Sequence, residues 1–368
     1  MQVFRRTALM SVLIAPSLIA GVPLFQSAQA QVPSAADRGY MAIPETGGVA
    51  GESKDVQIAR AVAAGPSTVT GNARIVGTDA SGKSSVLREG SNDFLCQPGN
   101  PKAVARPATC SNAAARQWSA DLAAGKPSPT NTVLGIVYMQ AGATELDAAG
   151  KTVKVGPQWI ITWPFEPKAS GLSATKKETG AYIRWAGTPY AHLNVMGQAV
   201  GPASPHLASE HAGHMPAMGV HDGSEKSAPT TEPAAVQMAR AISAGPKHVT
   251  DGARLMGVDP QGKELVLREG DNGFICKAGS LRIVADPPTC RSTTSKPGVW
   301  YMLAGATQRS VTDPADDKSP SLAIAPHWMI MTKFDPKTTG IPEHYSDVGA
   351  YAMWVNAKSA HLHVNGVP

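Results

Sequence analysis

The stretch VLREGSNDFLC at residues 86–96 recurs as VLREGDNGFIC at residues 266–276. The similarity continues on both sides of the two stretches, with the matching segments in the same order. The further pairs are IARAVAAGP (58–66) with MARAISAGP (238–246), VYMQAGAT (137–144) with WYMLAGAT (300–307), GPQWIITWPFEP (156–167) with APHWMIMTKFDP (325–336), and AHLNV (191–195) with AHLHV (360–364). An internal repeat on this scale predicts two homologous domains with a common fold.

The repeat also divides the chain. Residues 54–200 are expected to form the first repeat domain and residues 233–368 the second, each of an ordinary domain size. Residues 31–53 and 201–232 are rich in Gly, Pro, Ser and Ala, which is typical of a flexible tail and a linker. Residues 1–30 are expected to be a signal peptide.

Each repeat is predicted to be an α+β domain. Its opening segment places apolar residues near helical spacing and then ends in Gly-Pro, which favours a short amphipathic N-terminal helix. The rest alternates in the manner of strands, and residues 79–82 (Asp-Ala-Ser-Gly) are a hairpin signal between two of them. A helix followed by a run of strands predicts a mainly antiparallel β-sheet.

The N-terminus has the three parts of an export signal. Arg5 and Arg6 give it positive charge, an apolar run follows, and the small residues Ala28 and Ala30 provide a cleavage pattern. No later segment is apolar enough to span a bilayer, so no transmembrane segment is expected after cleavage. The sequence therefore predicts a periplasmic or extracellular protein.

Charge argues against one class of partner. The chain of 368 residues has a formal net charge of only +5, and aromatic residues make up 5% of it. No cluster of Lys and Arg is interleaved with aromatic residues, as binding to nucleic acid would require. We therefore expect no nucleic-acid partner.

Four cysteines, two in each repeat, are expected to form disulfides. The pairs Cys96–Cys110 and Cys276–Cys290 have the same spacing, and export favours oxidation. A zinc site is the alternative, but each repeat has only two cysteines and no Cys-x-x-Cys spacing. We therefore expect one disulfide in each domain, with a structural role.

Some charged residues are retained in both repeats. Arg88 and Glu89 recur as Arg268 and Glu269, each pair followed by glycine. Neighbours on a strand point to opposite faces, so the Arg and the Glu are not expected to serve one pocket. The favoured interpretation is a strand end at which both side chains pair with nearby loops; a binding site is the alternative.

Histidines change between the repeats. His192 recurs as His361, but the second repeat adds His363 two residues later and has His327 where the first has Gln158. On a strand, His361 and His363 would share one face. With His327 from another strand they could form a three-nitrogen metal site with an open position. A solvated polar strand face is the alternative.

The linker has the most unusual composition in the chain. Imidazole and thioether groups of this kind suit copper or zinc, and a segment without a fold can wrap around an ion. A plain spacer is the alternative. The candidate ligands are His206, His211, His214, His221, Met215 and Met218.

The repeat unit resembles a family of exported bacterial proteins of uncharacterised function. The resemblance rests on LREGxNxFxC, a second cysteine, YMxAGAT, PHWMI, and GxYxxWxGTPYAHL near the end of the unit. It covers most of both repeats and here takes the form of a tandem duplication. It implies the domain limits and export, and no activity.

No motif assigns a catalytic reaction. The sequence contains no Gly-x-Ser-x-Gly, no His-Glu-x-x-His and no phosphate-binding glycine loop. The favoured prediction is an exported, non-catalytic binding protein, with a transition metal bound through the linker or the second domain. The alternatives are a metal-dependent enzyme that uses the histidines of the second domain, and a cell-envelope or matrix interaction protein.

Overall fold

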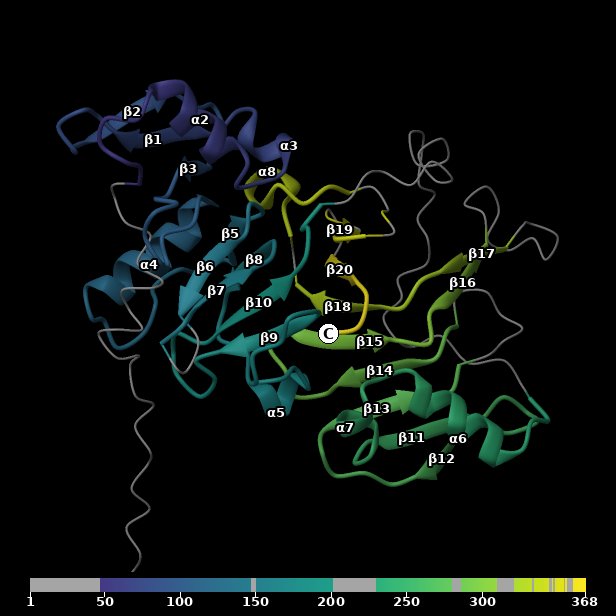
Figure 1. The fold of residues 1–368 in the computed structure, drawn as a ribbon. Coiled ribbons are helices and arrows are strands. Elements are labelled where there is room, and N and C mark those ends of the chain that lie inside the picture. Colours follow the sequence, from purple (N-terminus) through teal and green to yellow (C-terminus); the bar gives the residue numbers. More distant parts are fainter. Residues whose placement is uncertain are drawn as a thin grey trace, which may run out of the picture. The chain divides into compact units, whose positions relative to one another are not determined.

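The computed structural model describes residues 47–146, 150–200, 230–279, 286–309, 321–332, 334–343, 346, 348–353, 355 and 360–368. These described residues belong to one compact unit, and within it each repeat builds an eight-stranded sheet (Figure 1). The helices that the structure describes are short, and none has both the length and the apolar character needed to cross a membrane.

The two sheets have the same strand order. It is β2-β1-β3-β4-β5-β8-β10-β9 in the first repeat and β12-β11-β13-β14-β15-β18-β20-β19 in the second. The first sheet contains β1 (Arg74–Thr78), β2 (Ser84–Arg88), β3 (Leu95–Gln97), β4 (Thr109–Ser111), β5 (Gly135–Met139), β8 (Gln158–Thr162), β9 (Ala181–Arg184) and β10 (His192–Met196). The second contains β11 (Arg254–Val258), β12 (Glu264–Arg268), β13 (Phe274–Lys277), β14 (Thr289–Ser292), β15 (Gly298–Met302), β18 (His327–Met331), β19 (Ala350–Met353) and β20 (His361–Asn365).

Neighbouring strands are antiparallel except for β1 with β3 and β11 with β13, which are parallel. The predicted mainly antiparallel sheets are therefore confirmed. Two small hairpins, β6 (Ala143–Leu146) with β7 (Thr152–Val155) and β16 (Ala306–Arg309) with β17 (Ser321–Ile324), lie outside the main sheets.

The predicted disulfides are present, one in each repeat. Cys96 on β3 is bonded to Cys110 on β4, and Cys276 on β13 is bonded to Cys290 on β14. In each case the two cysteines lie directly opposite each other on paired strands. All four are fully buried, so the bonds lie in the core of each sheet.

A helix packs against the first strands of each sheet: α2 (Lys54–Val62) in the first repeat and α6 (Ala234–Ser243) in the second. One buried glutamine ties each helix to the sheet. Gln57 Nε2 donates to the Thr78 carbonyl at 2.8 Å, and Gln57 Oε1 accepts from the Thr78 amide at 2.9 Å. Gln237 makes the same pair of bonds to Val258. In each repeat the glutamine side chain thus bonds both the backbone N–H and the backbone C=O of a single strand residue. These two bonds fix the position of the helix along the strand.

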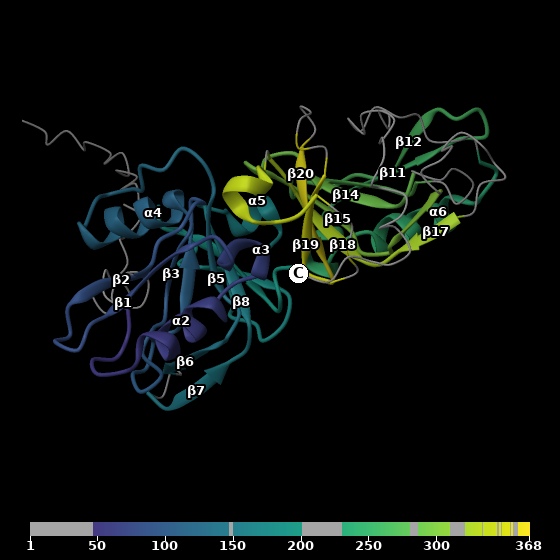
Figure 2. The ribbon, with the colours of Figure 1, turned by 90° about the horizontal axis from the view of Figure 1, so that it is seen from above.

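The repeats differ on the opposite face of the sheet. In the first repeat the inserted segment forms α4 (Ala113–Ala123), and its Trp118 and Leu122 are buried against Val137 and Ile160. Figure 2 shows α2 and α4 on opposite sides of this sheet. The second repeat has only the short connection 293–297 at this place, so no helix of this kind is inserted there.

Short turns link the repeats reciprocally. After β8, α5 (Pro167–Ser170) offers the Ser170 carbonyl to the Tyr301 hydroxyl at 2.5 Å. After β18, α8 (Pro336–Thr339) offers the Thr339 carbonyl to the Tyr138 hydroxyl, also at 2.5 Å. Tyr138 and Tyr301 occupy matching positions in the two repeats and are fully buried. The contacts between the repeats are therefore duplicated along with the fold.

Candidate functional site

The candidate site lies on one face of the second sheet, on the strands β15, β18, β20 and β19. Side chains alternate along a strand, so residues opposite each other on paired strands share a face. Trp328, Ile330, Leu362 and Val364 point into the main core. The histidines are on the other face, where the register pairs Met302 with His327, Met329 with His363, Tyr351 with His363, and Met353 with His361.

This register brings the three predicted ligands side by side. The ring centroids of His327 and His363 are 4.9 Å apart, and those of His361 and His363 are 4.7 Å apart. His361 Nε2 lies 2.8 Å from His363 Nε2. We call His327, His363 and His361 the histidine row. Its members are only 2%, 7% and 3% exposed, so this is a buried cluster and not a solvated strand face.

Hydrogen bonds fix the orientation of two of the rings. His327 Nδ1 donates to the Ala325 carbonyl at 2.8 Å, which leaves the lone pair of a neutral ring on Nε2. His363 Nδ1 lies 2.9 Å from the Tyr351 hydroxyl, and the two rings stack with centroids 4.6 Å apart. Partners of this kind at Nδ1 are what orient histidines that use Nε2 as a ligand.

Burial keeps His327 and His363 neutral. Desolvation lowers the pKa of His327, since burial disfavours the charged ring. Desolvation also lowers the pKa of His363 well below its ordinary value, and repulsion from His361 and His327 lowers it further. At neutral pH the rings of His327 and His363 therefore carry lone pairs and no charge.

The row is not by itself a three-ligand metal centre. Across the described residues, no group of three or more His, Cys, Asp or Glu side chains is arranged to hold a metal ion. The reason is geometric: His327 stacks on His363 at an interplanar angle of 22°, so the three rings line up instead of surrounding a point. The structure therefore brings the predicted histidines together but does not form the three-nitrogen arrangement with an open position.

The first repeat has a different set of polar groups on the same face. Gln158, Asn194 and His192 occupy the positions of the histidine row and are almost fully buried. Asn194 Nδ2 donates to the Tyr182 hydroxyl at 2.7 Å. Both amide atoms of Gln158, Asn194 Oδ1 and His192 Nε2 find no hydrogen-bond partner in the described part of the chain.

His192 sits in an aromatic cage beneath α4. Its ring makes edge-to-face contacts with Trp118 at 5.3 Å and Trp185 at 4.9 Å between centroids. Its Nδ1 lies 3.0 Å from the Tyr190 carbonyl. Desolvation in this cage lowers the pKa of His192 to about 3. A second imidazole is missing here, because Asn194 stands where the second repeat has His363.

The retained Arg-Glu pairs belong to the scaffold. Arg88 donates to the carbonyls of Thr70 and Ala73, the latter at 2.9 Å, and Arg268 makes the matching contacts. The carboxylates point the other way: Glu89 pairs with Arg74 at 3.4 Å, and Glu269 pairs with Arg254 at 3.3 Å, in exposed ion pairs. The LREG motif thus closes a loop and contributes nothing to the histidine row.

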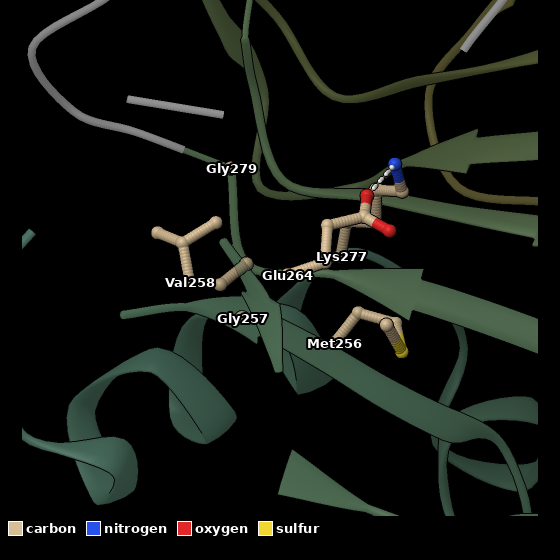
Figure 3. Close-up of a pocket in the computed structure, with 7 residues that line it drawn as sticks. Met256, Gly257, Val258, Glu264, Lys277 and Gly279 are labelled. Carbon is tan, nitrogen blue, oxygen red and sulfur yellow. Dashed lines mark hydrogen bonds and ion pairs between the residues drawn. The ribbon is translucent and has the colours of Figure 1, made fainter. Parts of the chain in front are cut away.

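A small cavity elsewhere in the second repeat does not have the volume of a ligand site. Figure 3 shows it at β11, β12 and β13, where Lys277 Nζ and Glu264 Oε1 form an ion pair at 2.7 Å beside Met256. Its cavity volume is about 10 Å³, which is about the space of one water molecule. It is also separated from β18 and β20 by β14 and β15 in the strand order.

Two groups of residues remain to be placed. The predicted linker ligands (His206, His211, His214, His221, Met215 and Met218) lie outside the described residues. The methionines on the face of the histidine row were not among the residues singled out from the sequence. Aligning the two repeats position by position along each strand would have revealed these methionines.

Comparison of the chain with protein-family models, with curated proteins and with solved structures gives no match.

Proposed function

We propose that this protein is an exported, non-catalytic binding protein whose second repeat binds a transition-metal ion between His361 and His363. The observation that supports this most directly is the 2.8 Å approach of their Nε2 atoms inside a buried face. Two imidazole nitrogens can meet this closely only if one donates a hydrogen bond to the other. For both Nε2 atoms to bind a metal ion, the shared proton would move to Nδ1 of the ring that carries it, and each Nε2 would then offer a lone pair.

The change needed to admit an ion is small. At about 2.0–2.1 Å from a tetrahedral ion, two imidazole nitrogens are roughly 3.3 Å apart, so the rings would separate by about half an ångström. The Tyr351 hydroxyl already meets His363 at Nδ1 and would stay there as the outer partner of the ligand. His327, stacked on His363, supports the ring from the other side.

Export is part of the same proposal. The N-terminal signal pattern, the two disulfides and the absence of a membrane-crossing helix among the described residues are compatible with a periplasmic or extracellular protein. The proposed family is that of the exported bacterial proteins whose motifs are divided between the two repeats: both carry LREGxNxFxC and YMxAGAT, the first alone carries GTPYAHL, and the second alone carries PHWMI.

The test is a titration of the signal-free, disulfide-intact protein with Zn²⁺ against a chromophoric chelator. His363→Asn is the informative variant, because Asn194 already fits the matching place and bonds to Tyr182. We expect it to weaken binding by at least about tenfold, since even outer partners of a metal change its affinity by that factor. His192→Gln, in the first repeat, is the matched control and should leave the isotherm unchanged.

A further variant separates the row from the linker. Replacing His206, His211, His214 and His221 together by glutamine should leave the tightest binding phase in place. If that phase disappears with the linker histidines and survives in His363→Asn, the metal binds in the linker and the proposal is wrong.

A further inference from the structure

The face that carries the histidine row is also lined with methionine. Met302, Met329, Met331 and Met353 lie on the same side of β15, β18 and β19 as the histidines, because each strand alternates. Met329 is directly opposite His363, and Met353 is directly opposite His361. Met329 is 3% exposed, and the other three are partly exposed. The two facing imidazoles thus have a thioether on each neighbouring strand.

The first repeat shows that these methionines are not required by the fold. The same strand positions there hold Ile160, Thr162 and Arg184, whereas Met139 matches Met302. Five positions on this face have gained an imidazole or a thioether in the second repeat, whereas Val137 is replaced by Trp300 and Met196 by Asn365. The five gains are Gln158 to His327, Ile160 to Met329, Thr162 to Met331, Arg184 to Met353 and Asn194 to His363.

One of these changes also removes a positive charge. Arg184 is directly opposite His192, and its charge lowers the pKa of that ring in addition to the larger effect of burial. At the matching place, Met353 faces His361 and carries no charge. At this position the second repeat therefore has no positive charge to repel a metal ion and offers a soft sulfur donor instead.

The donors favour an ion of low charge. None of the residues that β15, β18, β19 and β20 contribute to this face is an Asp or Glu. The cost of burying an ion rises steeply with its charge, and these four strands contribute no carboxylate to this face that would offset it. Thioethers are soft ligands that select Cu(I) over harder divalent ions, and imidazole also suits copper.

We infer that the second repeat is selective for Cu(I), bound by the facing imidazoles of His361 and His363 together with the thioethers of Met329 and Met353. This inference rests on the proposed metal-binding function and names the ion. It assigns the selectivity to the methionines and the binding itself to the histidines, so the two can fail separately.

The experiment compares monovalent and divalent probes on the full signal-free chain with its disulfides intact. Cu(I), kept reduced by ascorbate without oxygen, is titrated against a chromophoric Cu(I) chelator. Ag(I) serves as a redox-inert monovalent probe and Zn²⁺ as the divalent one. The informative variant is Met329→Leu with Met353→Leu, which keeps an apolar side chain of similar volume at each place. Met256→Leu, on β11, is the matched control.

We expect the native chain to hold Cu(I) and Ag(I) more tightly than Zn²⁺. The double leucine variant should lose at least about tenfold in affinity for both monovalent ions and should keep its affinity for Zn²⁺. Tighter binding of Zn²⁺, or monovalent affinities unchanged by the leucines, would overturn the inference while leaving the proposed function intact. Absence of binding of every probe would overturn both.

A measurement on the native chain covers the case in which the leucine variant does not fold. The copper-edge X-ray absorption spectrum of the Cu(I) complex should contain a sulfur shell as well as nitrogen. Because all four cysteines are in disulfides, that sulfur must come from methionine. A spectrum with nitrogen ligands alone would contradict the inference.

Discussion

His192 should make the first repeat sensitive to acid. The ring is fully buried, and its pKa falls from the ordinary value of 6.5 to about 3 because burial disfavours its charged form. Above pH 6.5 the ring is neutral in both the folded and the unfolded chain, so it has no effect on the pH dependence. Below that pH the unfolded chain takes up a proton that the folded chain does not, and stability therefore falls as pH falls.

The size of the effect follows from the two pKa values. Each pH unit between them corresponds to about 1.4 kcal/mol, so the native chain should lose roughly 1 kcal/mol by pH 5.5 and roughly 3 kcal/mol by pH 4.5 through this one ring. The loss should stop near pH 3, where the folded ring also accepts a proton. His192→Gln removes the titration and keeps a side chain that can donate to the Tyr190 carbonyl.

The assay is urea unfolding of the native chain and of His192→Gln at several pH values between 7.5 and 4.5, followed by tryptophan fluorescence. Trp118 and Trp185 pack against the ring, so they report on this region. Other titrating groups are common to both proteins and cancel in the difference between them. If the two stability profiles run parallel down to pH 4.5, the buried neutral imidazole is not responsible and the reasoning is refuted.

Three other outcomes are expected. Tyr138→Phe and Tyr301→Phe should each lower the free energy of unfolding by about 1–3 kcal/mol, since each leaves a buried carbonyl of the other repeat without its donor; equal stability in urea melts would contradict the reciprocal contact. Gly90→Ala should lower the free energy of unfolding by at least about 2 kcal/mol, because the added Cβ would lie 2.1 Å from the Arg74 backbone nitrogen. The control Gly156→Ala, whose Cβ would meet nothing within 4 Å, should leave the stability in thermal melts nearly unchanged, and equal melting of the two variants would contradict the close packing at Gly90. Reduction of the disulfides should lower stability by about 3 kcal/mol for each bond in the chain-entropy picture, and unchanged melting under reductant would contradict it.

Much of the fold could be predicted because the sequence contains it twice. The strand from Arg74 to Thr78 and the strand from Gln158 to Thr162 show local patterns that survive in both repeats, and the cysteines retain their spacing. The strand order could not be predicted, because it depends on which distant strands meet. The parallel pairing of β1 with β3 and the reciprocal contacts of α5 and α8 depend on such long-range packing.

The same division applies to the candidate site. The shared face of His361 and His363 follows from the period of a strand, and the sequence predicts it. The position of His327 beside them depends on β18 lying next to β20, which only the structure provides. The stacking of His327 on His363 depends on side-chain packing, and it turns an expected three-ligand centre into a row.

The most direct test of the central claim is the metal content of the protein recovered after export from cells grown with both copper and zinc. Three proteins are compared by elemental analysis: the native chain, His363→Asn, and a variant lacking residues 205–223. We predict stoichiometric copper in the native chain and in the variant without the linker segment, and its loss in His363→Asn. Copper lost with residues 205–223 but retained in His363→Asn, or a native chain free of metal, would contradict the account.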